Sequence, residues 1–145
     1  MESRMKRKAR RKSGFTLVEL VIVIAILAIL AAIAIPVITT TINSSKMSVM
    51  ESDCETVNLI IKEAMMASMA QLDTVVYDGK KATDAALTVG EVLEANELDL
   101  SVLNSKTIGG KTYCIVWSAS AKNAVVSQTT TPWADTYKVK DLIPS

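Results

Sequence analysis

One apolar run, residues 15–38, constrains this chain more than any other feature, because Glu19 is its only charged residue. About 20 apolar residues let an α-helix cross the hydrocarbon core of a membrane at about 1.5 Å per residue. The run is apolar on every face, which is typical of a helix surrounded by lipid. A secretory signal peptide is the alternative, with roughly 7 to 15 apolar residues and a small-residue cleavage site such as AIA at residues 32–34.

The net charge of +1 conceals two segments of opposite charge. Residues 1–14 contain seven Lys and Arg and one Glu, whereas the rest of the chain contains nine basic and fourteen acidic residues. Lys and Arg beside an apolar span hold that end in the cytoplasm, so we expect the chain after the span to be delivered outside. Nucleic-acid binding is disfavoured, because the basic cluster abuts the apolar run without interleaved aromatic residues and the remainder is acidic.

Glu19 needs a physical reason inside such a run. A carboxylate at the centre of a membrane helix costs about 2.5 to 3.5 kcal/mol on insertion scales, and less near an interface. Two explanations fit. The side chain lies near the cytoplasmic end and reaches the headgroups, or it is paired with a positively charged group.

The stretch KSGFTLVEL, residues 12–20, resembles the processing motif of type IV prepilins and of the related pseudopilins of type II secretion. The resemblance covers the leader and the apolar run. It implies that prepilin peptidase cuts between Gly14 and Phe15 and that Phe15 is then N-methylated. Gly14 has no Cβ, so its backbone can lie close to a protease. Glu19 would attract the amino terminus of a neighbouring subunit, whose ordinary pKa of about 7.7 to 8.0 keeps it largely protonated at neutral pH.

A long helix in two halves follows the cut. Residues 15–38 form the apolar half, and residues 39–72 are predicted to form an amphipathic half. Pro36 lies where the halves join and predicts a kink or a locally loosened helix. The stripe predicted to be buried recurs at spacings of three and four residues. It consists of Met47, Met50, Cys54, Val57, Ile61, Ala64 and Ser68.

Residues 73–145 are predicted to form a small head domain. Residues 77–84 are typical of a turn, and residues 87–98 of a short helix. Residues 109–120, which begin with Gly-Gly, and residues 122–131 predict two strands, with a weaker third at residues 137–143. The expected fold class is therefore α+β: a long N-terminal helix packed on a small C-terminal antiparallel sheet, which agrees with the pilin fold.

The two cysteines lie on elements that we expect to pack together. Cys54 is on the predicted stripe and Cys114 is in the strongest predicted strand. A disulfide is allowed outside the cytoplasm, and closing a loop of about 60 residues would contribute on the order of 4 kcal/mol in the chain-entropy model. Two buried free thiols are the alternative. Pilins often have a disulfide nearer the carboxyl end, so this pairing would depart from the family pattern.

The sequence predicts no enzyme, cofactor or metal site. It has no His and no nucleophile-elbow, P-loop or dinucleotide motif. Asp78 and Asp84 have the wrong spacing for a calcium loop, and Trp117 and Trp133 are expected in the core.

The resemblance implies a structural subunit of a type IV pilus or pilus-like surface filament that supports adhesion, motility or DNA uptake. Its partners would be identical or related subunits, prepilin peptidase, a platform membrane protein and an assembly ATPase. It would lie in the cytoplasmic membrane before assembly, with its N-terminus in the cytoplasm, and then on the cell surface. The alternatives are a minor pilin or pseudopilin of a secretion or competence machine, and a membrane-anchored or secreted binding domain.

Overall fold

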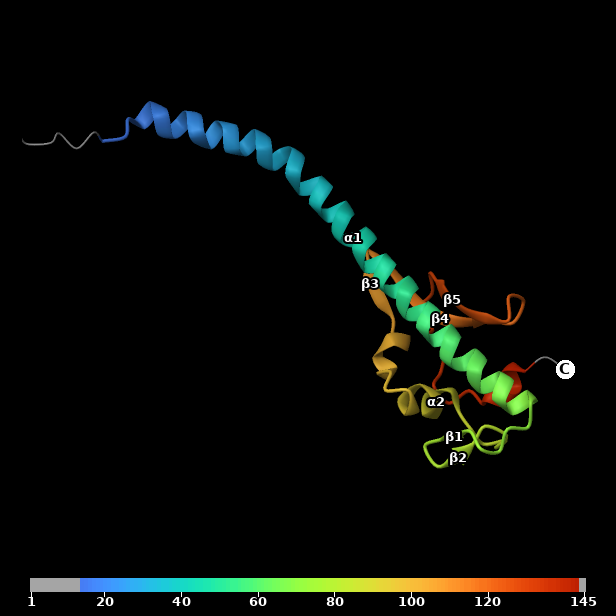
Figure 1. The fold of residues 1–145 in the computed structure, drawn as a ribbon. Helices are drawn as coiled ribbons and strands as arrows, with labels where there is room; N and C mark the ends of the chain where they lie inside the picture. Colours follow the sequence, from blue (N-terminus) through green and yellow to red (C-terminus); the bar gives the residue numbers. More distant parts are fainter. Residues whose placement is uncertain (1–13, 144–145) are drawn as a thin grey trace, which may run out of the picture. The chain divides into compact units, whose positions relative to one another are not determined.

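The structure is a computed structural model that describes residues 14–143, so residues 1–13 of the predicted leader lie outside the described residues. The chain divides between Thr39 and Thr40 into two compact units. In chain order, the elements are α1 (Leu17–Met69), β1 (Val76–Tyr77), β2 (Lys80–Lys81), α2 (Val89–Ala95), the 3-10 helix η1 (Leu100–Leu103), β3 (Lys106–Ile108), β4 (Lys111–Ser118), β5 (Asn123–Ser127) and the 3-10 helix η2 (Val139–Leu142) (Figure 1). This is the predicted α+β fold, with a long N-terminal helix and a C-terminal antiparallel sheet.

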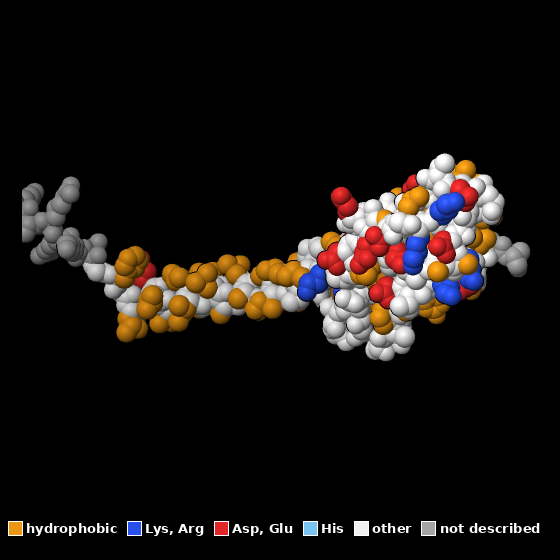
Figure 2. All heavy atoms as spheres, turned by 90° about the horizontal axis from the view of Figure 1, so that it is seen from below, with side chains coloured by type: hydrophobic (Ala, Val, Ile, Leu, Met, Phe, Trp, Pro, Cys, Tyr) orange, Lys and Arg blue, Asp and Glu red, His pale blue; other side chains and the backbone are white. Residues whose placement is uncertain are grey.

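The first unit contains the apolar half of α1. Its side chains are exposed from Leu17 to Ile38, and Figure 2 shows hydrophobic side chains along the visible face of this segment. Pro36 lies inside α1, and the helix is assigned continuously through it. The hydroxyl of Thr39 donates to the carbonyl of Pro36 at 2.9 Å. Pro36 therefore does not end the helix, and the kink there stays a prediction.

The second half of α1 contributes one buried face to the head. The predicted stripe is confirmed at its centre, where Met50, Cys54, Val57, Ile61 and Ala64 are buried. The ends of the stripe are only half-buried, and Met65 and Ala67 are also buried. A helix that buries a face of this width is held by packing against the head more than by its own propensity.

The main sheet has three antiparallel strands in the order β3-β4-β5. Ile108 pairs with Lys111, so only Gly109 and Gly110 form the turn between β3 and β4. Both glycines have positive φ, +59° and +77°, as a two-residue type I′ hairpin requires. The strands predicted at residues 109–120 and 122–131 are confirmed as β4 and β5. The short strand β3 was not predicted.

Asn58 connects α1 to the outer edge of β5. Its side-chain oxygen accepts the N–H of Ala124 at 2.6 Å, and its side-chain nitrogen donates to the carbonyl of Ala124 at 2.8 Å. Ala124 is 2% exposed, so these backbone groups have little access to water. The amide of Asn58 thus occupies hydrogen-bonding groups that a further strand would otherwise satisfy.

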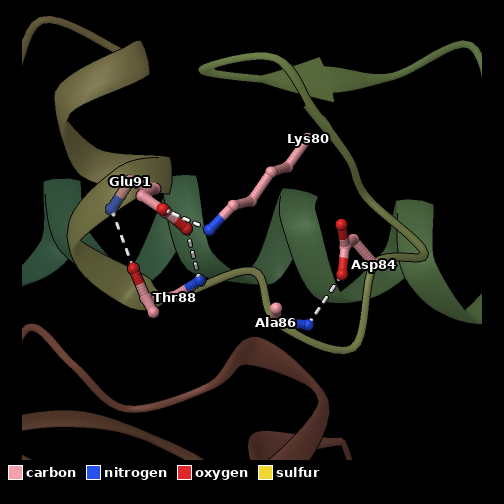
Figure 3. Close-up of polar contacts among 5 residues, drawn as sticks. All are labelled: Lys80, Asp84, Ala86, Thr88 and Glu91. Carbon is pink, nitrogen blue, oxygen red and sulfur yellow. Dashed lines mark hydrogen bonds and ion pairs between the residues drawn. The ribbon is translucent and has the colours of Figure 1, made fainter.

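The predicted short helix is confirmed as α2, and a capping box begins it (Figure 3). The hydroxyl of Thr88 accepts the N–H of Glu91 at 3.3 Å, and the Glu91 carboxylate accepts the N–H of Thr88 at 3.0 Å. Lys80 donates to the same carboxylate, which links β2 to α2. The Lys80 hydrogen bond, helped by the N–H of Thr88, lowers the pKa of Glu91.

The predicted third strand at residues 137–143 is wrong. Only Lys138 makes a β-bridge, to Thr88, and the chain then turns into η2. The carbonyl of Tyr137 accepts the N–H of Val89 at 2.8 Å, and the N–H of Val139 donates to the carbonyl of Leu87 at 2.9 Å. This segment therefore satisfies its backbone against the residues before α2 and not at an edge of the main sheet.

Candidate functional site

The predicted cleavage bond lies in exposed backbone just before α1. Residues 14–16 are not helical, and Phe15 is 87% exposed. A Cβ added to Gly14 would meet no atom within 4 Å, so packing in the described chain does not require glycine there. Exposed, non-helical backbone is a segment that a protease can bind. A requirement for Gly14 would therefore have to come from a partner and not from the fold.

Thr16 is the N-cap of α1, a role that the sequence analysis missed. Its carbonyl accepts the first intrahelical bond, from the N–H of Leu20 at 3.2 Å, and its hydroxyl accepts the N–H of Glu19, also at 3.2 Å. Thr and Glu three residues apart form the signature of a capping box, and the structure contains the Thr half of it. The sequence contains this capping-box pattern at residues 16–19, TLVE, where Thr is followed three residues later by Glu.

Glu19 therefore has a local reason to be acidic besides the functional role predicted from the sequence. It lies in the first turn of α1, where a negative charge is stabilised by about 0.3 to 1 kcal/mol through the helix dipole at exposed sites. Its side chain is exposed, and no ion pair is recorded for it among residues 14–143. Its carboxylate is thus available to a cationic group outside the described residues.

The structure brings some predicted site residues together and separates others. Gly14, Phe15 and Glu19 lie within six consecutive residues at the start of α1, whereas Pro36 lies further along the same helix. The cysteines belong to the head, Cys54 on α1 and Cys114 on β4.

In the structure Cys54 and Cys114 are buried free thiols, the alternative that the sequence analysis left open, and the possible disulfide between them stays a prediction. The two sulfurs have different polar neighbours. Cys114 Sγ donates to the carbonyl of Thr129 at 3.1 Å, and the Asn58 side-chain nitrogen lies 3.9 Å from Cys54 Sγ. Burial raises the pKa of both thiols, so neither is a reactive thiolate at neutral pH.

Trp133 is buried in the core, as the sequence predicts, whereas Trp117 is only half-buried against it. Trp133 is 5% exposed, and its ring stacks on that of Trp117 with centroids 5.4 Å apart. Residues 14–143 contain no group of three or more His, Cys, Asp or Glu side chains placed to hold a metal ion.

Comparison with known protein families identifies a motif near the start of the chain. Residues 9–35 match the model of the prokaryotic N-terminal methylation motif. This chain carries the type IV prepilin signature. The motif supports a type IV pilin-like or pseudopilin protein, a structural and not an enzymatic family. No curated protein and no solved structure matches the chain.

The prepilin signature and α1 together indicate membrane anchoring. Within the described residues, α1 is the one helix long and apolar enough to cross a membrane, by length and composition. The matched residues include the predicted cut site and Glu19 but end before the head.

Proposed function

We propose that this pilin-like protein is a structural subunit of a type IV pilus or pilus-like surface filament. Prepilin peptidase would cut it between Gly14 and Phe15, N-methylation would follow at Phe15, and the apolar half of α1 would then drive polymerisation. The observation that carries the proposal is a prepilin signature placed directly on a helix whose apolar side chains are exposed over residues 15–38. So much apolar surface is unstable in water. Lipid would cover it first, and the same helices of other subunits afterwards.

The proposed route from membrane to filament requires several partner proteins. The basic leader would hold the N-terminus in the cytoplasm while α1 crosses the cytoplasmic membrane. A platform membrane protein and an assembly ATPase would then move the cut subunit into a filament on the cell surface. Identical or related subunits are the main partners, and the filament would support adhesion, motility or DNA uptake.

Glu19 would set the register of assembly through its charge. Cleavage creates an α-amino group on Phe15, which is largely protonated at neutral pH. A carboxylate and an ammonium group attract each other far more strongly in apolar surroundings than in water, and an unpaired carboxylate there is penalised. A neighbouring subunit whose amino group meets Glu19 would therefore be held at one position along the helix.

Two variants separate this charge from the helix-capping role seen in the structure. Glu19→Gln keeps a side chain that suits a capping box but removes the charge, whereas Thr16→Ala removes the cap and keeps the charge. We expect Glu19→Gln to be cut normally but to lower the filament yield per cut subunit by about ten-fold, equivalent to 1.4 kcal/mol. Thr16→Ala should assemble close to wild type per cut subunit. The opposite ranking would mean that the acid serves only the helix.

Mass spectrometry of the amino-terminal peptide from the native cell surface tests the proposal directly. A chain that begins at N-methylated Phe15 is the expected result. A chain that begins near Ile35 would indicate ordinary secretion, and one that still contains residues 4–12 would indicate an uncut anchor. Either of these outcomes would overturn the proposal.

A minor pilin or pseudopilin is the second candidate, because the same motif supports it. The two candidates differ in quantity. A major pilin should be the principal protein of long filaments sheared from cells, whereas a pseudopilin should be scarce in that fraction. Quantitative mass spectrometry of sheared filaments distinguishes them.

A further inference from the structure

A groove of about 420 Å³ lies in the head between α1 and β3. Ser45, Lys46 and Val49 of α1 line one side, and the three residues of β3 line the other. The lining is mainly apolar, and Val49 is 58% exposed. The groove is therefore an apolar surface with a lysine on each of the two elements that form it.

The groove begins a short distance along the chain from the apolar run. Ser45 follows Ile38, the last residue of that run, by seven residues, and α1 is helical over all of them. Seven helical residues cover about 10 Å. The polar layer of a bilayer adds about 5 to 8 Å to each side of its hydrocarbon core. When residues 15–38 cross a membrane, the groove is therefore within reach of the lipid headgroups.

The turn between β3 and β4 lies at the same end of the head. Figure 1 shows β3 alongside the first part of α1 in the head, and a Cβ added to Gly109 would lie 3.4 Å from the side-chain nitrogen of Asn43. Lys111 follows this turn directly opposite Ile108, so the two side chains lie on one face of the sheet. Lys106, two residues before Ile108, lies on that face as well. Lys111 therefore borders the groove.

The positive charge at the groove is only partly compensated. Lys106 forms an ion pair with Asp53 of α1 at 3.0 Å. Lys46 and Lys111 are exposed, and among residues 14–143 no ion pair is recorded for either of them. The groove therefore presents two uncompensated positive charges beside an apolar surface.

The two segments that supply this end of the head contain no acidic residue. Residues 39–50 contain one lysine and no Asp or Glu, and residues 100–134, which include the whole main sheet, contain three lysines and no acid. Over residues 15–145, in contrast, fourteen acids outnumber nine lysines. The chain after the predicted cut is acidic overall, yet the segments around the groove are purely basic. Such a surface is complementary to a negatively charged partner.

We propose that the groove binds an anionic phospholipid of the membrane that α1 crosses. Lys46 and Lys111 would contact the phosphate, and the carbon atoms of the lipid would cover the apolar lining at Val49. A free phosphate would leave that lining uncovered, and lysines close to a membrane-crossing helix favour anionic lipids. The inference rests on the membrane-anchored stage of the proposed function and adds a lipid ligand for the head.

Site-specific crosslinking tests this site in the full chain. The protein is placed in bilayers of equal amounts of phosphatidylcholine and phosphatidylglycerol, with a photo-reactive amino acid in place of Val49. Intact mass should show adducts with anionic phosphatidylglycerol in about 25-fold excess, about five-fold for each of the two lysines. Because the adduct forms at one residue, lipid bound by the basic leader does not contribute. The same amino acid in place of Leu59, exposed on α1 outside the groove, is the matched control and should show no such preference.

Removing single charges tests the role of the lysines. Lys46→Gln and Lys111→Gln should each lower the preference for phosphatidylglycerol at position 49 by about five-fold. Lys62→Gln removes the same charge from an exposed position elsewhere on α1 and should leave the preference unchanged. An unchanged preference in both groove variants, or an equal loss in Lys62→Gln, would overturn the inference.

Other occupants of the groove give different results. In these bilayers, crosslinks from position 49 to a second copy and not to lipid would identify a contact between subunits. Loss of the lipid preference on adding inorganic phosphate, but not sodium chloride of equal ionic strength, would identify a site for free phosphate. Either result would overturn the inference. A protein that is cut and forms filaments but gives no lipid adduct in bilayers would overturn this inference alone. A chain never cut after Gly14 would overturn the proposed function, whereas the adduct at position 49 can still be measured in that uncut chain.

Discussion

Replacing Asn58 with Ala should destabilise the head by about 2 to 4 kcal/mol. The change removes the hydrogen bonds of 2.6 Å and 2.8 Å to the backbone of Ala124. A hydrogen bond contributes about 1 kcal/mol net, and a buried polar group left without a partner costs about 1 to 3 kcal/mol. Ala124 is 2% exposed, so water can replace these bonds only if the edge of β5 moves.

Urea unfolding of the full chain in detergent micelles measures this effect. The fluorescence of Trp117 and Trp133 reports on the head, because both tryptophans lie there. We expect a lower midpoint with an unchanged slope, which indicates a loss of stability without a change in the surface exposed on unfolding. Hydrogen exchange at the Ala124 amide should also become faster.

Thr56→Ala is the matched control for Asn58→Ala. Its hydroxyl donates to the carbonyl of Ser52 one turn earlier on the same exposed helix face, so its loss should change stability by less than about 0.5 kcal/mol. An Asn58→Ala head that unfolds like the control, with unchanged exchange at Ala124, would refute the argument that this amide satisfies the backbone of Ala124.

Three further changes test local features of the head by the same unfolding measurement. Gly110→Ala should cost about 1 kcal/mol from backbone strain alone, since φ is +77° and the added Cβ meets nothing within 4 Å; no loss would contradict the turn assignment. Thr88→Ala should cost about 1 kcal/mol by removing the cap of α2, and wild-type stability would exclude that role. The Lys80 hydrogen bond holds the pKa of Glu91 below its ordinary value of 4.5, so the unfolded chain is protonated first as the pH falls. This contribution is present above about pH 4.5 and is lost as the pH falls through the lower pKa of the folded state. Below about pH 4.5, the free energy of unfolding should therefore fall more steeply with decreasing pH in wild type than in Glu91→Gln. Equal dependence on pH in the two proteins would contradict this role of Glu91.

The helices of this protein could be predicted from local sequence, and the errors lie where distant segments meet. The apolar run and the stripe of period three to four were enough for α1, because helical hydrogen bonds form within one segment. The cap at Thr16 was also readable, since the Thr and Glu of a capping box are three residues apart. Residues 137–143 misled the prediction because their backbone partners, Leu87 and Val89, lie about 50 residues earlier in the chain.

The candidate site residues and the features of the head also differ in whether local sequence predicts them. Gly14, Phe15 and Glu19 lie within one short motif that the family model matches, so the sequence alone was enough to propose them. Asn58 and the groove beside β3 join residues that are far apart in the chain, and no short pattern indicates them. The short strand β3 was missed because three residues give too little alternation to recognise.

The sequence by itself determined the signature at residues 9–35, the apolar helix that follows it and the α+β class, because each depends on residues that are neighbours along the chain. Only the tertiary structure placed Cys54 and Cys114 in one core, where both are buried as free thiols. It also decided that Asn58 satisfies the outward backbone groups of Ala124 on β5, whereas β3 pairs only with β4. The physical reason is that these features depend on which distant side chains and peptide groups meet when α1 packs on the sheet, and that choice belongs to the whole head.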